Sequence, residues 1–160
     1  MKYRICKSFE VESGHMLSKH PGRCRFPHGH SRRVDLVLSS ETLDDRDMVC
    51  DFKALKLAVG EYLDAFDHAM VMNAADASRE AMETARIADR VIVFEGEDPT
   101  TEVMARRIFE HVAAVLGAAD KGEPPVYRDA EGHAFTLRQG ITLERVRVTE
   151  TSSSWAEYGV

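Results

Sequence analysis

Two alternating segments enclose a histidine-rich stretch, and this arrangement constrains the fold more than any other feature of the chain. Between residues 3 and 11 apolar residues alternate with polar ones, and the same period of two returns between residues 30 and 38. A period of two is typical of half-buried β-strands. The sequence therefore predicts two strands that flank the histidine-rich stretch.

The histidines of this stretch predict a zinc site. Residues two apart in a strand point to the same face, so His28 and His30 can direct two imidazoles at one point. His15 is well placed to supply a third imidazole from the neighbouring strand. Neutral imidazole is a common zinc ligand, and three histidines without an obvious fourth ligand are typical of a catalytic zinc that keeps one position for water or substrate.

Cys24 leaves the type of zinc site open. It lies four residues before His28, with Arg23 and Arg25 on either side. As a soft ligand it can complete a closed structural site of three histidines and one cysteine. If it stays off the metal, the neighbouring cations favour its thiolate, which can then act as a base or a nucleophile. Spacing alone does not decide between these two interpretations.

The positive charge of this region is local. The formal net charge of the chain is -6, yet residues 13–34 contain five basic residues and no Asp or Glu. The five are Lys19, Arg23, Arg25, Arg32 and Arg33. A cationic pocket with a metal, in an otherwise acidic protein, favours a small anionic substrate over nucleic acid, which usually requires a basic face across the whole domain.

Length and composition predict a single cytoplasmic domain. The chain has 160 residues, 44% of them hydrophobic, so residues 1–160 can bury one sizeable core. No stretch approaches the roughly 20 apolar residues of a membrane span, and the first residues contain no apolar signal core. The three cysteines are irregularly spaced, unlike a secreted disulfide framework. Two of them, Cys6 and Cys50, lie in apolar runs, where we expect small buried side chains.

The remaining periodicity predicts an α+β domain. Asp51 is a good N-cap for an amphipathic helix over 52–66, and Pro99 lies in the first turn of a second helix that we expect to end near Gly117. Shorter elements are expected at 77–88, as a helix, and at 90–94, 134–137, 141–149 and 155–158, as strands. This order predicts an antiparallel sheet with helices on one face.

Several charged residues lie at the ends of these elements. Asp67 and His68 follow the first helix. Adjacent side chains do not easily bond each other. The residues alone therefore favour a histidine stabilised by the helix dipole over a catalytic pair. Glu150 follows an apolar strand, where a carboxylate is costly unless it is paired. It can pair with an arginine or accept two parallel N–H bonds from a guanidine-like heterocycle. The helix dipole accounts for Glu102.

Together these motifs resemble the 6-pyruvoyl-tetrahydropterin synthase and 6-carboxy-tetrahydropterin synthase family over nearly the whole chain. The matching segments are FEVESGH at 9–15, CRFPHGH at 24–30, DFKALK at 51–56, FDH at 66–68, PTTEVMA at 99–105 and VTET at 148–151. The three residues between Cys24 and His28, and Val103 after PTTE, resemble the 6-carboxy branch more than the 6-pyruvoyl branch.

The resemblance implies a fold and an assembly. The family's T-fold packs a four-stranded antiparallel sheet against two main helices on one face. Here an extra helical segment and an extra hairpin-like excursion are expected in 74–97 and 117–140, which are longer than in compact bacterial members. The family forms homo-oligomeric rings, usually hexamers of two trimers, with active sites between subunits. Cys24 of one chain would then meet Asp67 and His68 of another.

The resemblance also implies a reaction and a set of residues. It implies a zinc-dependent lyase that converts 7,8-dihydroneopterin triphosphate to 6-carboxy-5,6,7,8-tetrahydropterin, on the way to queuosine. A sister lyase that makes 6-pyruvoyl-tetrahydropterin, and a non-catalytic zinc- or pterin-binding relative, are the alternatives. The implied residues are His15, His28 and His30 for zinc; Cys24, Asp67 and His68 for proton transfer; and Glu150 for the pterin edge, with Thr101 and Glu102 near the same pocket.

Overall fold

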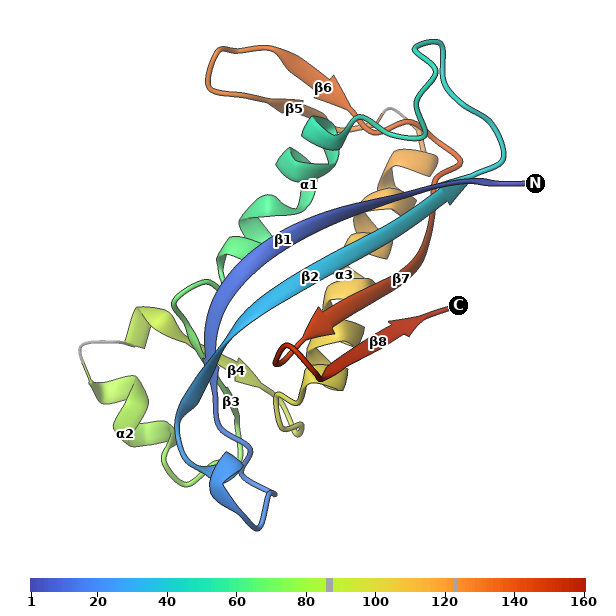
Figure 1. Cartoon of the computed structure of the whole chain (residues 1–160). Helices are drawn as coiled ribbons and strands as arrows, with labels where there is room; N and C mark the ends of the chain where they lie inside the picture. The colour runs from blue at the N-terminus through green and yellow to red at the C-terminus, as the bar shows by residue number, and fades with distance from the viewer. Residues whose placement is uncertain (86–87, 123) are drawn as a thin grey trace.

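A six-stranded sheet in the order β4-β3-β1-β2-β7-β8 forms the centre of the molecule (Figure 1). The computed structural model describes residues 1–85, 88–122 and 124–160. The strands of this sheet are β1 (Tyr3–His15), β2 (His28–Ser40), β3 (Met70–Asn73), β4 (Val91–Phe94), β7 (Thr142–Thr149) and β8 (Trp155–Gly159). The predicted α+β class is confirmed. The expected sheet of four antiparallel strands is present, but it is only part of a larger sheet. Four strands are antiparallel as expected, and β3 and β4 extend the sheet through parallel pairing.

The strand of the central sheet that the sequence did not predict is β3, and it lies next to the histidines. Its residues Val71, Met72 and Asn73 are completely buried. A strand buried on both faces shows no alternation, and four residues are too few to reveal a period. The pairing of β3 with β1 sets Val71 beside His15, and the amide of Met16 donates to the carbonyl of Val71 over 3.2 Å. β3 therefore anchors the end of β1 from which His15 projects.

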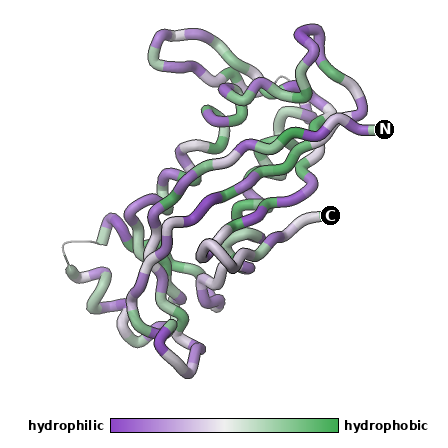
Figure 2. The backbone as a smooth tube through the Cα atoms, in the orientation of Figure 1, coloured by the Kyte–Doolittle hydropathy of each residue, from purple (hydrophilic) through white to green (hydrophobic). Residues whose placement is uncertain are grey.

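The long β1–β2 ladder places the histidines opposite one another. Its register runs from Tyr3 opposite Ser40 to His15 opposite His28. Figure 2 shows hydrophobic and hydrophilic segments along this ribbon. The burial of β1 alternates from Ile5 to Val11 as predicted, whereas β2 is buried continuously from Val34 to Ser40. Near the histidines the strands approach closely, since a Cβ on Gly29 would lie 3.3 Å from the carbonyl oxygen of Ser13. The two predicted strands are thus longer than expected, and they include all three histidines.

Two helices, α1 (Phe52–Asp64) and α3 (Thr101–Asp120), cover one face of the sheet (Figure 1). Asp51 caps α1 as expected, because its side chain accepts from the amide of Lys53 over 2.7 Å. α3 passes the expected end at Gly117 by three residues. Its apolar face continues there with buried Leu116 and Ala119, so core packing outweighs the low helix propensity of one glycine.

The core between these helices and the sheet is built from both layers. Fully buried residues include Leu36 and Leu38 of β2, Leu55 and Val59 of α1, and Val112 of α3. Cys50 is buried as expected. Cys6 is exposed, contrary to expectation, because it lies in β1 between inward-facing neighbours and points to the sheet face away from the helices.

Two additions flank this core. The helical segment α2 (Arg79–Thr84) is shorter than the expected 77–88, and residues 86 and 87 of that prediction lie outside the described residues. The strands β5 (Val126–Arg128) and β6 (Ala134–Thr136) form the expected hairpin, apart from the main sheet. Short 3-10 turns occupy Arg23–Arg25 and Ala88–Arg90. Within the described part of the chain, no helix is both long and apolar enough to cross a bilayer.

Candidate metal and substrate site

Three imidazoles converge where β1 ends and β2 begins. His15 comes from β1, whereas His28 and His30 come from β2. The ring centroids are 4.4 Å apart for His15 and His28, 5.1 Å for His15 and His30, and 5.2 Å for His28 and His30. One nitrogen from each ring lies within 4.8 Å of the other two. The structure therefore brings the three predicted zinc ligands together.

Backbone carbonyls set the tautomers of two of these rings. Nδ1 of His15 donates to the carbonyl of Pro99, and Nδ1 of His28 donates to the carbonyl of Phe26, both over 2.8 Å. Because a carbonyl only accepts, Nδ1 carries the proton in the neutral form of each ring, and Nε2 is then the nitrogen with the lone pair. Burial lowers the pKa of His15 to about 4 despite its bond to Pro99, so this ring is neutral at pH 7.

The third ring leaves a buried nitrogen without a partner. Nε2 of His30 is buried and makes no hydrogen bond to any described residue. The nearby Oε1 of Glu150, 3.5 Å away, is within ion-pair distance but does not form a hydrogen bond with it. Leaving a buried polar atom unsatisfied is costly, and a metal ion at the centre of the cluster would satisfy it. The donor set fits a metal ion that prefers imidazole ligands, such as zinc.

Cys24 lies close in sequence to this cluster but does not join it. It occupies the short turn Arg23–Arg25, and its carbonyl accepts from the amide of Leu17 over 3.0 Å. Two groups among the described residues bring three possible ligand atoms together, His15 with His28 and His30 and, elsewhere, Asp129 with Glu131 and His133, and Cys24 belongs to neither. The thiol is half-buried. This geometry favours an open site over the closed site of three histidines and one cysteine.

Asp67 and His68 do bond each other, contrary to the expectation from adjacency. Nδ1 of His68 lies 2.7 Å from Oδ2 of Asp67, while Oδ1 of Asp67 accepts from the amide of Glu12 over 2.8 Å. His68 has a φ of 56°, a left-handed conformation that turns its ring back toward the preceding side chain. The Glu12 amide and the His68 ring lower the pKa of Asp67. The side chain of His68 is 74% exposed, so the pair faces outward.

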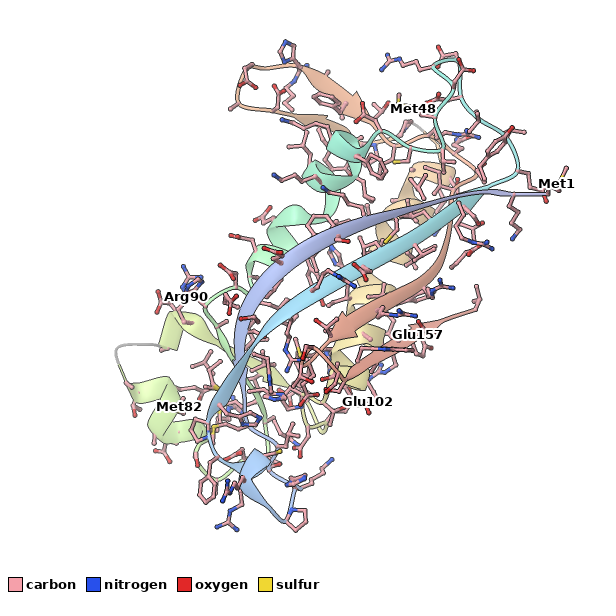
Figure 3. The ribbon with its side chains drawn as sticks, viewed as in Figure 1. Met1, Met48, Met82, Arg90, Glu102 and Glu157 are labelled. Atoms are coloured by element: carbon pink, nitrogen blue, oxygen red, sulfur yellow. The ribbon has the colours of Figure 1, made fainter. Side chains whose placement is uncertain are left out.

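Glu150 lies beside the histidines and is held by Thr101. The hydroxyl of Thr101 donates a short hydrogen bond to Oε2 of Glu150. Burial alone would raise the pKa of Glu150, but the Thr101 bond and the positive charge of Arg32 outweigh it and lower the pKa. Glu102, labelled at the start of α3 in Figure 3, is exposed, and the described residues offer it no hydrogen bond or ion pair. The structure thus brings Thr101, but not Glu102, into contact with Glu150.

A second group of residues, which sequence reasoning missed, supports the site from behind. Asp98 is buried and accepts from the Ser18 hydroxyl over 2.6 Å, the Lys19 amide over 2.7 Å and the Asn73 side chain over 2.9 Å. These bonds hold the loop whose next residue, Pro99, orients His15. Pro99 precedes α3 instead of lying in its first turn as expected, because Thr100 caps the helix. An acidic residue one position before this proline was the available signal, but its partners are distant in sequence.

A groove is lined by residues that adjoin the histidines in the sequence. It has a volume of about 690 Å³ and lies between the turn after β1 and the segment that leads into α2. Met82 of α2, labelled in Figure 3, also lines it. Met16, which follows His15, and Pro27, which precedes His28, both line it. Of the basic residues in this turn, Lys19 and Arg25 line the groove. The groove therefore has two cations on its walls and is lined by the sequence neighbours of two of the histidines.

The fold and the site together define a T-fold protein with a three-histidine metal site beside a carboxylate. The chain belongs to the family described as 6-pyruvoyl tetrahydropterin synthase, whose family model matches residues 4–159. This result confirms the family that the sequence motifs resembled.

Relatives and a solved structure agree with this assignment. The chain is 26% identical to the 6-carboxy-5,6,7,8-tetrahydropterin synthase of Aquifex aeolicus, covering 99% of this chain and 98% of that protein. It is 27% identical to the Bacillus subtilis protein of the same name, covering 98% of this chain and 84% of that protein. The structure of Caenorhabditis elegans 6-pyruvoyl tetrahydropterin synthase shares the fold, with a TM-score of 0.62 and 19% identity over 100% of this chain and 96% of that one.

Proposed function

We propose that this protein is a zinc-dependent lyase that converts 7,8-dihydroneopterin triphosphate to 6-carboxy-5,6,7,8-tetrahydropterin, releasing acetaldehyde and triphosphate. The observation that carries the proposal is the three-histidine cluster, with one buried nitrogen unsatisfied, directly beside the carboxylate of Glu150. The names of the Aquifex and Bacillus relatives support the 6-carboxy product. The product would serve queuosine biosynthesis, and the cytoplasmic location stays a prediction.

His15, His28 and His30 would hold the zinc ion. The bonds from His15 to Pro99 and from His28 to Phe26 leave Nε2 of both rings as the metal-binding nitrogen. Bound zinc supplies a Lewis acid that polarises substrate oxygens and makes neighbouring protons more acidic.

Glu150 would bind the edge of the pterin that carries the 2-amino group and a ring N–H. Such an edge resembles a guanidinium in offering two parallel N–H donors to a carboxylate. Oε2 of Glu150 already accepts from Thr101, so the orientation of the carboxylate is set before the ligand arrives. The lowered pKa of Glu150 keeps this carboxylate charged at neutral pH, so it can accept both N–H bonds from the ligand.

His68 and Cys24 would transfer protons. Asp67 accepts from Nδ1 of His68, which leaves Nε2 of this exposed ring free to take or give a proton. The half-buried thiol of Cys24 supplies the second group. We further propose that the protein assembles as a hexamer of two trimers. The exposed Asp67–His68 pair of one subunit would then complete the site around Cys24 of its neighbour.

The groove lined by Lys19 and Arg25 would accept the triphosphate. The substrate's side chain would lead from the pterin past the metal, and Met16 and Pro27, the sequence neighbours of His15 and His28, line this groove. Two cations on its walls favour a polyphosphate electrostatically. Asp76, which also lines it, limits how much negative charge the groove accepts.

A product assay tests the proposal. The zinc-loaded protein is incubated with 7,8-dihydroneopterin triphosphate, and the products are followed by mass spectrometry. We expect 6-carboxy-5,6,7,8-tetrahydropterin and acetaldehyde. If 6-pyruvoyl-tetrahydropterin is the only product, the sister lyase is correct; if the pterin binds without turnover, the protein is a binding relative. Cys24→Ala should abolish turnover while the zinc content stays full.

A further inference from the structure

A buried arginine contacts both a metal-binding histidine and the threonine that holds Glu150. Arg32 follows His30 by two positions on β2, so both side chains lie on the same face of the strand. Only 2% of its surface is exposed, although arginine is among the residues least often buried. A charged group in this position must be held by hydrogen bonds, because an unsatisfied buried charge is strongly destabilising.

The contacts of this guanidinium extend to both halves of the site. Nε donates to the hydroxyl of Ser13 over 3.2 Å. Nη1 donates to the hydroxyl of Thr101 over 3.0 Å and to the carbonyl of Thr149 over 3.4 Å. Nη2 lies 3.4 Å from both ring nitrogens of His15, so it contacts the imidazole as a whole. One side chain thus touches a metal-binding histidine and the residue that holds Glu150.

The direction of these hydrogen bonds is determined by the chemistry of the groups. A guanidinium only donates, so the Thr101 oxygen accepts from Arg32 and must direct its single proton elsewhere. That proton goes to Oε2 of Glu150. The order Arg32 to Thr101 to Glu150 leaves Oε1 of Glu150 on the side of His30, 3.5 Å from its Nε2. This relay of two hydrogen bonds, from Arg32 to Thr101 and from Thr101 to Glu150, therefore presents one carboxylate oxygen toward the metal-binding end of the pocket.

We propose that Arg32 is a positioning residue that fixes Glu150 relative to the metal site through Thr101 and its contact with His15. The identity of the ligand that Glu150 receives rests on the proposed function. With the carboxylate held at one orientation and one offset from the histidines, a heterocycle bound there presents its side chain to the metal. Loss of Arg32 would free the Thr101 hydroxyl to rotate, and the carboxylate would lose both its fixed orientation and a nearby positive charge.

Binding of pterin, the bare bicycle without a side chain, tests this role without catalysis. Affinity is measured by fluorescence titration of the zinc-loaded protein, together with its zinc content. Arg32→Met should weaken pterin binding by about 10- to 100-fold, the equivalent of one hydrogen bond to a charged group, and leave the zinc content full. Thr101→Val breaks the same relay without touching Arg32 and should weaken binding similarly, whereas Thr101→Ser should restore it.

Arg33→Met provides the matched control. Arg33 is the next residue on β2, but its side chain is 57% exposed and pairs with Asp35 on the other face, so this variant should bind pterin as wild type does. The double variant of Arg32→Met and Thr101→Val should have the same pterin affinity as the single variant that binds pterin less tightly, because both changes break the same relay.

Three results would overturn the proposal. Pterin affinity within about threefold of wild type in both Arg32→Met and Thr101→Val would show that the relay does not position Glu150. Loss of zinc from Arg32→Met would show that Arg32 only maintains the histidine cluster. Unchanged pterin affinity in Glu150→Gln would refute the pterin assignment itself, and with it this proposal, so the failure of the proposed function is distinguishable from the failure of the relay alone.

Discussion

Replacing Asp98 with asparagine should destabilise the loop that supports the metal site. The two carboxylate oxygens accept three hydrogen bonds: Oδ1 from Ser18 and Asn73, over 2.6 and 2.9 Å, and Oδ2 from the Lys19 amide over 2.7 Å. Asparagine keeps an oxygen on one side only and presents an NH₂ group on the other. If the oxygen stays with Ser18 and Asn73, the Lys19 amide faces another donor and loses its partner.

The size of this effect follows from the burial of the group. Asp98 is 7% exposed, so water does not replace the lost partner readily. An unsatisfied buried donor costs about 1–3 kcal/mol, and the two remaining bonds lose the strength that a charged acceptor gives them. We expect Asp98→Asn to lower the free energy of unfolding by about 2–4 kcal/mol at pH 7. Ser18→Ala, which removes one bond, should cost about 1 kcal/mol.

The effect should depend on pH in a defined direction. Burial alone would raise the pKa of Asp98, but the bonds from Ser18, Asn73 and Lys19 outweigh it and lower the pKa. A carboxyl with a depressed folded-state pKa stabilises the protein above its unfolded pKa, about 3.9, and that contribution is lost as the pH falls through the folded pKa. The difference in the free energy of unfolding between wild type and Asp98→Asn should therefore become smaller below about pH 4.

Urea unfolding followed by circular dichroism, at one fixed protein concentration, measures these differences at pH 7 and at several acidic values. Asp45→Asn is the control, because Asp45 is exposed and should change stability by less than about 0.5 kcal/mol. If Asp98→Asn is as stable as Asp45→Asn at pH 7, the loop is not held by Asp98, and the orientation of His15 must depend on other contacts.

Three further predictions concern the reaction. Arg25→Ala should raise KM for the triphosphate substrate about tenfold with little change in kcat. Arg23 lies on the same turn but does not line the groove, so Arg23→Ala should change KM by less than about twofold. His68→Ala should lower kcat by about 10²- to 10⁴-fold without loss of zinc, and an undiminished rate would rule out its role in proton transfer. Dialysis against a chelator should abolish turnover and added zinc should restore it; full activity in the metal-free protein would contradict metal dependence.

The local periodicity of the chain predicted much of the fold, because each long element has one apolar face. The period of two in 3–11 and 30–38 indicated the strands that became β1 and β2. β3 escaped prediction because burial on both faces removes the alternation, and its partners β1 and β4 are distant in sequence. Cys6 was misplaced because cysteine was expected to be a small buried side chain, whereas the alternation in 3–11 puts it on the face of β1 opposite Ile5 and Phe9.

The candidate site was predictable where its geometry follows from strand alternation, and less so elsewhere. His28 and His30 share a face of one strand, so their convergence could be inferred. The bond between Asp67 and His68 depends on a left-handed backbone at His68, which a non-glycine residue rarely adopts and the sequence does not signal. Arg32 was counted only as part of a basic segment, because its partner Thr101 lies 69 positions further along the chain.

The proposed chemistry depends most directly on an open three-histidine metal site with Cys24 free to move protons. X-ray absorption spectroscopy of the zinc-loaded protein measures the atoms bound to the metal. We predict nitrogen and oxygen ligands only, at about 2.0–2.1 Å, with no sulfur. A sulfur ligand at about 2.3 Å in the wild type, absent in Cys24→Ala, would show that Cys24 closes the site and would contradict the proposed lyase mechanism.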